Sequence, residues 1–323
     1  IREHATPAAG MAMDCVTTAD GTGNLWIQVP QTSVGTQFAM FLSASIGFTT
    51  GQPAMVVIGQ PDFTSGEGPG VLTSAQNVLF PDGSAAIDAN GKLYLMDSAD
   101  HRVLGYNAVP TVNHASADFV LGVGSFVLLP PGEPTSTGFA DPRKMEFSGS
   151  KALLLDVTNH RILIWNAVPA DGTAPADVVV GQPDMTSNAS GNGATGLELP
   201  HGMNVAGGKL IVADSDNNRV LVWNAIPTVN GTAADLVLGQ ADFVGTTANS
   251  SGVAAGMNFP SGVWSDGTRL LVADFGNNRV LIWDTFPTVN GEAPDWALGQ
   301  PNLTTATAAT TVSGFNGPYT LAS

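Results

Sequence analysis

One short tract recurs four times along the chain, and this repetition constrains the fold more than any other feature. The tract begins with Asp, ends with Arg and two aliphatic residues, and is found at 97–104, 156–163, 214–221 and 274–281. A second landmark, Gly-Gln-Pro-Asp or a variant of it, begins at Gly59, Gly122, Gly181, Gly239 and Gly299. The chain is therefore built from repeats of about 60 residues, and each copy buries its apolar face against the next copy.

Four short apolar runs in each repeat indicate strands, because they are rich in β-branched and aromatic residues and are bounded by Gly, Pro, Asn and Asp. In the clearest copy these runs are Pro260–Asp266, Arg269–Asp274, Arg279–Trp283 and Trp296–Gly299. Asp266-Gly267 is a strong signal for a tight hairpin turn. Four antiparallel strands per repeat, without a helical period, predict an all-β fold in which each repeat is one blade of a β-propeller.

The third predicted strand of each clear copy ends in a large aromatic residue. These residues are Tyr106, Trp165, Trp223 and Trp283. We expect them to fill the space between adjacent blades, because a large aromatic ring is a natural filler between sheets.

The tract Asp-x-x-Asn-His/Asn-Arg-Val/Ile-Leu, preceded by Gly-Lys-Leu-x-Val-Ala-Asp, resembles the NHL repeat, which forms β-propellers. The resemblance covers about residues 7–323 and is weakest over the first 60 residues. It implies one propeller domain over 1–323, with blades at about 7–63, 79–126, 139–185, 199–243 and 259–303 and a closing strand at 315–323.

The number of blades leaves two outcomes open, because the first strand occurs six times and the other three strands five times. Propellers that resemble this chain usually have six blades. In one outcome Gly317–Leu321 closes a five-bladed ring by pairing beside the N-terminal blade, which would remove an unpaired strand edge. In the other outcome it begins a sixth blade that another chain completes.

The charge of the chain bears on its partners. The 27 acidic residues outnumber the 11 basic ones, so the formal net charge is −16, which opposes binding to nucleic acid or anionic membranes. No apolar run approaches 18 residues. The low content of charged residues, the abundant Thr, Ala, Gly and Ser, and an N-terminus without Met are typical of a mature exported bacterial protein, secreted or periplasmic.

The Asp and Arg of the recurrent tract are the most conspicuous charged pair, and they lie five residues apart across a predicted turn. Because they recur in every clear copy, we expect them to build the blades and not to carry catalysis. The pairs are Asp97–Arg102, Asp156–Arg161, Asp214–Arg219 and Asp274–Arg279.

Residues that differ between copies are better candidates for function. The turn between strands two and three lies on the same face as the long links to the next blade, at 64–79, 127–138, 186–198, 244–258 and 304–314, so this face is the predicted binding face. The blades of a propeller surround a central channel, and we call the end of this channel on the predicted binding face its mouth. A ring of polar residues at the mouth could hold a cation or a small polar ligand. The predicted ring consists of Asp82, Asp141, His201, Ser261 and Asn316.

The residues favour a non-enzymatic binding or scaffold protein, with a protein partner or its own copies as ligand. The five histidines show no paired spacing typical of metal sites, and no nucleophile elbow or phosphate loop is present, so no catalytic residue, metal or cofactor is predicted. One alternative is a metal-dependent enzyme, because propellers include lyases and lactone hydrolases. Another is a lectin, provided that Trp165, Trp223 and Trp283 are exposed.

Overall fold

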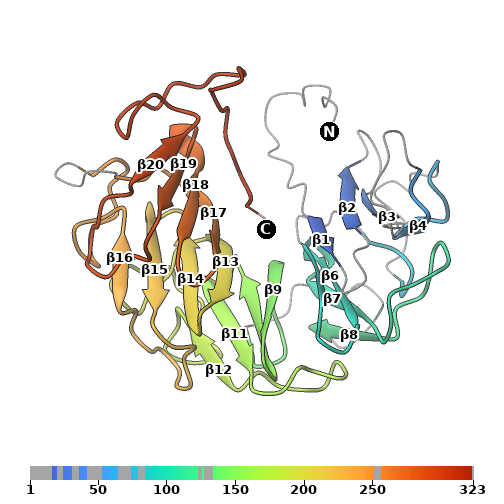
Figure 1. Cartoon of the computed structure of the whole chain (residues 1–323). Helices are drawn as coiled ribbons and strands as arrows, with labels where there is room; N and C mark the ends of the chain where they lie inside the picture. Colours follow the sequence, from blue (N-terminus) through green and yellow to red (C-terminus); the bar gives the residue numbers. More distant parts are fainter. Residues whose placement is uncertain are drawn as a thin grey trace.

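The structure is a computed structural model, and the described residues comprise the strands at 17–19, 25–30 and 36–41 and the ranges 53–64, 74–78, 84–122, 126, 134–250 and 256–321. The strands form five four-stranded antiparallel sheets, which we call blades 1 to 5 (Figure 1). This confirms the predicted all-β propeller architecture.

Each blade runs from its first strand to its fourth in sequence order. Blade 1 contains β1 (Thr17–Ala19), β2 (Leu25–Pro30), β3 (Thr36–Phe41) and β4 (Val56–Ile58). Blade 2 contains β5 (Ala85–Ile87), β6 (Leu93–Asp97), β7 (Arg102–Tyr106) and β8 (Phe119–Gly122). Blade 3 contains β9 (Pro142–Ser148), β10 (Lys151–Asp156), β11 (Arg161–Trp165) and β12 (Val178–Val180).

The last two blades follow the same plan. Blade 4 contains β13 (Pro200–Ala206), β14 (Lys209–Asp214), β15 (Arg219–Trp223) and β16 (Leu236–Leu238). Blade 5 contains β17 (Pro260–Ser265), β18 (Leu270–Asp274), β19 (Arg279–Trp283) and β20 (Trp296–Leu298). Single 3-10 turns, η1 (Ser98–Asp100) and η2 (Phe275–Asn277), join the second and third strands of blades 2 and 5.

The first strands of the blades line the centre of the arrangement and contact one another in the order β1, β5, β9, β13 and β17 (Figure 1). The apolar core lies between successive blades, because side chains alternate across each strand and neighbouring sheets bury both faces. Tyr106, Trp165, Trp223 and Trp283 are all buried in these clusters, as predicted.

Two sequence-based expectations concern the ends of the chain. The start of the predicted first blade, at 7–16, lies outside the described residues, and the described β1 pairs with β2 at Thr17–Ala19. Residues 315–321, which we call the closing segment, belong to none of the five sheets, so the described residues do not show the expected pairing beside blade 1. The closing segment instead contacts blade 5, where the Ser261 hydroxyl donates a hydrogen bond to the Tyr319 carbonyl at 2.7 Å.

The recurrent Asp and Arg form buried ion pairs in blades 2 to 5. The Nε atom of each Arg lies 2.7–2.8 Å from a carboxylate oxygen of its Asp, and these side chains are at most 3% exposed. The residue before each Arg has the left-handed backbone conformation, with φ between 53° and 55° at His101, His160, Asn218 and Asn278. Asn and His are among the residues that tolerate this conformation, which explains their places in the repeat.

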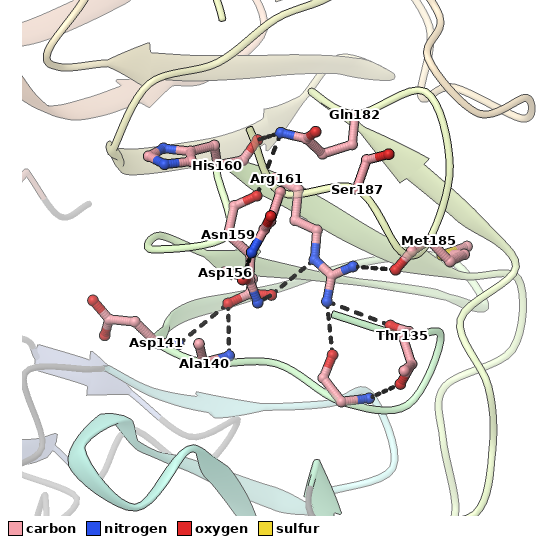
Figure 2. Close-up of polar contacts among 12 residues, drawn as sticks. Thr135, Ala140, Asp141, Asp156, Asn159, His160, Arg161, Gln182, Met185 and Ser187 are labelled. Atoms are coloured by element: carbon pink, nitrogen blue, oxygen red, sulfur yellow. Dashed lines mark hydrogen bonds and ion pairs between the residues drawn. The ribbon is translucent and has the colours of Figure 1, made fainter. Parts of the chain in front are cut away.

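Each Arg also ties two links to its blade, as Figure 2 shows for Arg161. Arg161 donates from one guanidinium nitrogen to the Met185 carbonyl at 2.7 Å, in the outgoing link, and from the other to the Gly138 carbonyl at 2.7 Å, in the incoming link. The other oxygen of Asp156 accepts the Ala140 N–H. Blades 4 and 5 repeat these contacts through Arg219 and Arg279.

Burial of these pairs has an energetic cost. It raises the pKa of the Asp97, Asp214 and Asp274 carboxyls, and the neighbouring Arg opposes this rise. A buried pair of this kind adds little net stability, but loss of one partner leaves the other charge buried and uncompensated. The pairs therefore fix the conformation of the links more than they stabilise the fold.

We expect Arg219→Met to lower the free energy of unfolding by about 3–5 kcal/mol, because it leaves the Asp214 carboxylate buried without its partner. Arg269→Met is the matched control. The Arg269 side chain is 54% exposed in its ion pair with Asp266, so its loss should cost no more than about 1 kcal/mol. Urea denaturation of both variants measures the difference, and equal losses would contradict the structural role of the buried pair.

Candidate functional site

The strand register identifies which residues occupy equivalent places at the mouth of the channel. Pro142, Pro200 and Pro260 each lie opposite the Asp of the buried pair, so the next residues, Arg143, His201 and Ser261, are equivalent. In the closing segment Pro318 takes the place of these prolines, because the Gly317 N–H before it donates to Asn278 as the Phe259 N–H before Pro260 donates to Asn218. Tyr319 is therefore the fourth described member of the ring.

In blade 3 and in the closing segment, the residue at the ring position is not the one predicted from the sequence. Asp141 lies two residues before the ring position, because Pro142 and not Ala140 takes the place of Pro200. Asn316 is exposed and lies three residues before Tyr319. His201 and Ser261 have the expected places, and Asp82 lies outside the described residues. Whether the ring binds a ligand remains a prediction.

The structure brings the described ring residues together with Asp141. The Arg143 guanidinium lies 3.1 Å from the Asp141 carboxylate, which is directed away from the buried Asp156–Arg161 pair in Figure 2. Arg143 also acts electrostatically on His201. The Ser261 hydroxyl and the Tyr319 carbonyl are joined by the hydrogen bond described above.

Aromatic rings surround His201 on the side of blade 5. The His201 ring centroid lies 5.0 Å from that of Phe259 and 6.2 Å from that of Tyr319. Phe275, from η2, contacts both Phe259 and Tyr319 with edge-on geometry. All four rings are partly exposed. We call Arg143, His201, Phe259, Phe275 and Tyr319 the mouth cluster.

The sequence pattern did not predict Arg143, Phe259, Phe275 or Tyr319 as site residues. Aligning each repeat on its proline, instead of on the start of each apolar run, would have found Arg143 and Tyr319. Phe275 is a large aromatic residue where the equivalent residues of blades 2, 3 and 4 are Ser98, Val157 and Ser215.

His201 is neutral near pH 7. Burial is the main cause that lowers its pKa to about 4, and the positive charge of Arg143 adds to this effect. The carbonyl of Leu199 lies 2.8 Å from Nδ1 and can only accept a hydrogen bond, so Nδ1 carries the proton. Nε2 is then the acceptor nitrogen, and the mouth cluster combines an acceptor, a cation and aromatic surface.

The described residues also bear on two other predicted kinds of site, a metal site and a sugar-binding site. No group of three His, Cys, Asp or Glu side chains that could hold a metal ion occurs among them. The indole N–H groups of Trp165, Trp223 and Trp283 donate to carbonyls of their own blades, and these rings are buried. They are therefore not available to stack on a sugar, so the condition for the lectin interpretation is not met.

Comparison with known proteins agrees with the repeat and the fold. The NHL repeat family matches residues 197–223, which include the buried pair of blade 4. The chain is a β-propeller that contains an NHL repeat. A comparison with curated proteins gives no match.

Three solved structures similar to this propeller illustrate the comparison, and the first of them supports the fold. A periplasmic gluconolactonase from Pseudomonas aeruginosa has a TM-score of 0.51 and 15% identity, covering 90% of this chain and 70% of that protein. Virginiamycin B lyase from Staphylococcus aureus has a TM-score of 0.39 and 11% identity, covering 83% of this chain. A Bacteroides fragilis protein provisionally assigned as a 6-phosphogluconolactonase has a TM-score of 0.46 and 18% identity, covering 83% of this chain. The propeller spans 65% of the length of the lyase and 64% of that of the Bacteroides protein.

None of the helical segments in the described part of the propeller has the length and hydropathy needed to cross a membrane.

We expect the His201 imidazole to titrate near pH 4 by NMR. The folded protein then binds fewer protons than the unfolded chain between pH 6.5 and about 4, so stability falls as the pH falls through this range, by up to about 3 kcal/mol. His201→Asn should remove this component of the acid sensitivity.

Arg143→Met should raise the pKa of His201, because it removes a nearby positive charge. Lys144→Met is the control, because Lys144 pairs with Glu146 at 3.0 Å and does not contribute to the pKa of His201. A His201 midpoint near 6.5 in the unmodified protein, or equal shifts in the two variants, would disprove this description of the mouth.

Proposed function

We propose that this protein is a non-enzymatic binding propeller. Its predicted binding face, which carries the mouth cluster and which we call the mouth face, docks a protein partner. The observation that carries the proposal is the mouth cluster, in which three aromatic rings, a His and an Arg from successive repeats converge and remain partly exposed. Aromatic residues and Arg dominate the energetics of protein interfaces.

The rigidity of this face supports the proposal. The buried Asp–Arg pairs tie described residues of the links, such as Gly138 and Met185, to the turns between the second and third strands, so these link residues are held in place before binding. Ordering before binding lowers the entropic cost of association. The net charge of −16 favours a partner with a neutral or basic surface, outside the cell or in the periplasm.

A metal-dependent lyase or lactonase is the second candidate, because the structural neighbour with a TM-score of 0.51 is named a gluconolactonase. This function would require Asp82 and Asp141 to converge with His201 on a metal ion. Elemental analysis of the purified protein distinguishes the two: a stoichiometric metal would favour the enzyme, and its absence would favour the binding protein.

Partner binding can be tested with a pair of charge reversals. Proteins captured by chemical cross-linking in the native extract are purified, and their affinities for the unmodified protein, Arg143→Glu and Arg269→Glu are measured by calorimetry. Arg269 lies in the turn between the first and second strands of blade 5, away from the mouth face, and serves as the control.

We expect Arg143→Glu to weaken binding by about tenfold or more, because it places a negative charge within an interface anchor, and Arg269→Glu to leave it unchanged. Equal affinities of all three proteins would contradict a partner site at the mouth. A concentration-dependent mass in light scattering that is lost only in Arg143→Glu would identify a second copy as the partner.

A further inference from the structure

The closing segment occupies the place of a first strand of a further blade. The Phe259 N–H, just before β17, donates to the Asn218 side chain of blade 4 at 2.8 Å, and the Gly317 N–H donates to the equivalent Asn278 of blade 5 at 2.9 Å. The backbone of the closing segment also passes close to Gly262, where an added Cβ would lie 2.8 Å from the Tyr319 carbonyl oxygen. Gly202 has the same relation to Ser261 of the next blade.

The fourth strand of blade 5 is exposed where its equivalents are buried. Trp296 and Leu298 in β20 are 60% and 50% exposed. The register aligns Leu298 with Val180 of blade 3 and Leu238 of blade 4, both of which are 0% exposed because the next blade covers them. The outer part of blade 5 therefore presents an apolar surface of the kind that a further blade covers elsewhere in this structure.

A specific pair of hydrogen bonds joins blade 1 to blade 2, blade 3 to blade 4 and blade 4 to blade 5, and we call it the clip. The central residue of a fourth strand donates its N–H to an Asn side chain of the next blade and accepts the N–H of the residue after that Asn. Val179 makes these bonds with Asn230 at 3.0 Å and with Gly231 at 3.0 Å. Val237 makes them with Asn290 at 3.1 Å and with Gly291 at 2.9 Å.

Blades 1 and 2 share the same clip, through Val57, Asn113 and His114. Ala297 is the equivalent central residue of β20, and no described residue forms a clip with it. The clip residues Asn113, Asn230 and Asn290 are all engaged within this chain. The connection between the third and fourth strands of blade 1 contains no Asn at 42–55, so neither blade 1 nor a second copy offers a clip of this kind.

We infer that the exposed side of blade 5 and the closing segment bind a three-stranded polypeptide segment with the chemistry of strands two to four of this repeat. The closing segment supplies the first strand of the resulting blade, and the partner adds strands to its edge by ordinary ladder hydrogen bonds. An Asn-Gly connection of the partner clips Ala297, and its apolar face covers Trp296 and Leu298. The closing segment also carries Tyr319 of the mouth cluster, whereas Trp296, Ala297 and Leu298 lie outside that cluster.

The full chain itself provides the probe. By sequence count Ser323 corresponds to Ser265, so a second copy of residues 266–303, which hold strands two to four of blade 5, is appended directly after Ser323. We expect Trp296 to lose its reactivity in hydroxyl-radical footprinting and to reach the low oxidation rate of buried Trp283. We also expect the denaturation midpoint of the fusion to exceed that of the unmodified chain.

The clip is tested with the same segment added as a separate peptide. Asn290→Ala in the peptide should weaken its binding about two- to tenfold, the effect of one lost hydrogen bond. Val289→Thr in the peptide is the control, since Val289 is exposed beside the clip and does not form it.

Two results would overturn the inference. One is a fusion in which Trp296 stays as reactive as in the unmodified chain and the midpoint does not rise. The other is light scattering that shows the unmodified chain as a dimer with Trp296 already protected, because a second copy would then be the occupant. Both readouts are independent of Arg143→Glu, so failure here and failure of the mouth proposal are distinguishable.

Discussion

The loops of this propeller depend on one interaction, the buried ion pair between an Asp at the end of a second strand and an Arg at the start of the third. The Asp accepts a backbone N–H from the incoming link, and the Arg donates to carbonyls of both links. Because a buried charge needs a partner, each module positions its neighbours' loops in one way. The same interaction that identifies the repeat in the sequence therefore shapes the face on which binding is proposed.

The sequence was sufficient to predict the architecture of the blades, because periodic signals reinforce one another across copies. The strands of blade 5 and the buried Trp residues follow from the repeat. The mouth was harder to predict. In blade 3, Pro142 and not Ala140 takes the place of the proline that begins the first strand in blades 4 and 5. Contacts such as that between His201 and Tyr319 join residues of different repeats, and no periodic signal in the sequence connects them.

The two proposed binding surfaces, the mouth cluster and the exposed β20, are built from different kinds of residue. The mouth cluster is made of residues that vary between repeats, such as Arg143, His201 and Tyr319, and it suits a partner specific to this protein. The exposed β20 is made of residues that conform to the repeat, and it suits a partner built on the same plan. Buried polar pairs hold the first surface in shape, and backbone hydrogen bonds direct association at the second.

Hydrogen exchange of the link amides in Arg219→Met tests most directly whether the buried pair holds the loops of the mouth face. Loss of the guanidinium removes the bonds to the carbonyls of Gly193, Gly196 and Phe243 and leaves the bond between Asp214 and the Glu198 N–H without its charge partner. We predict faster exchange at residues 191–198 and 243–247, with unchanged protection in β6 and β7 of blade 2 under native conditions. Link amides that keep their protection in Arg219→Met would contradict the account.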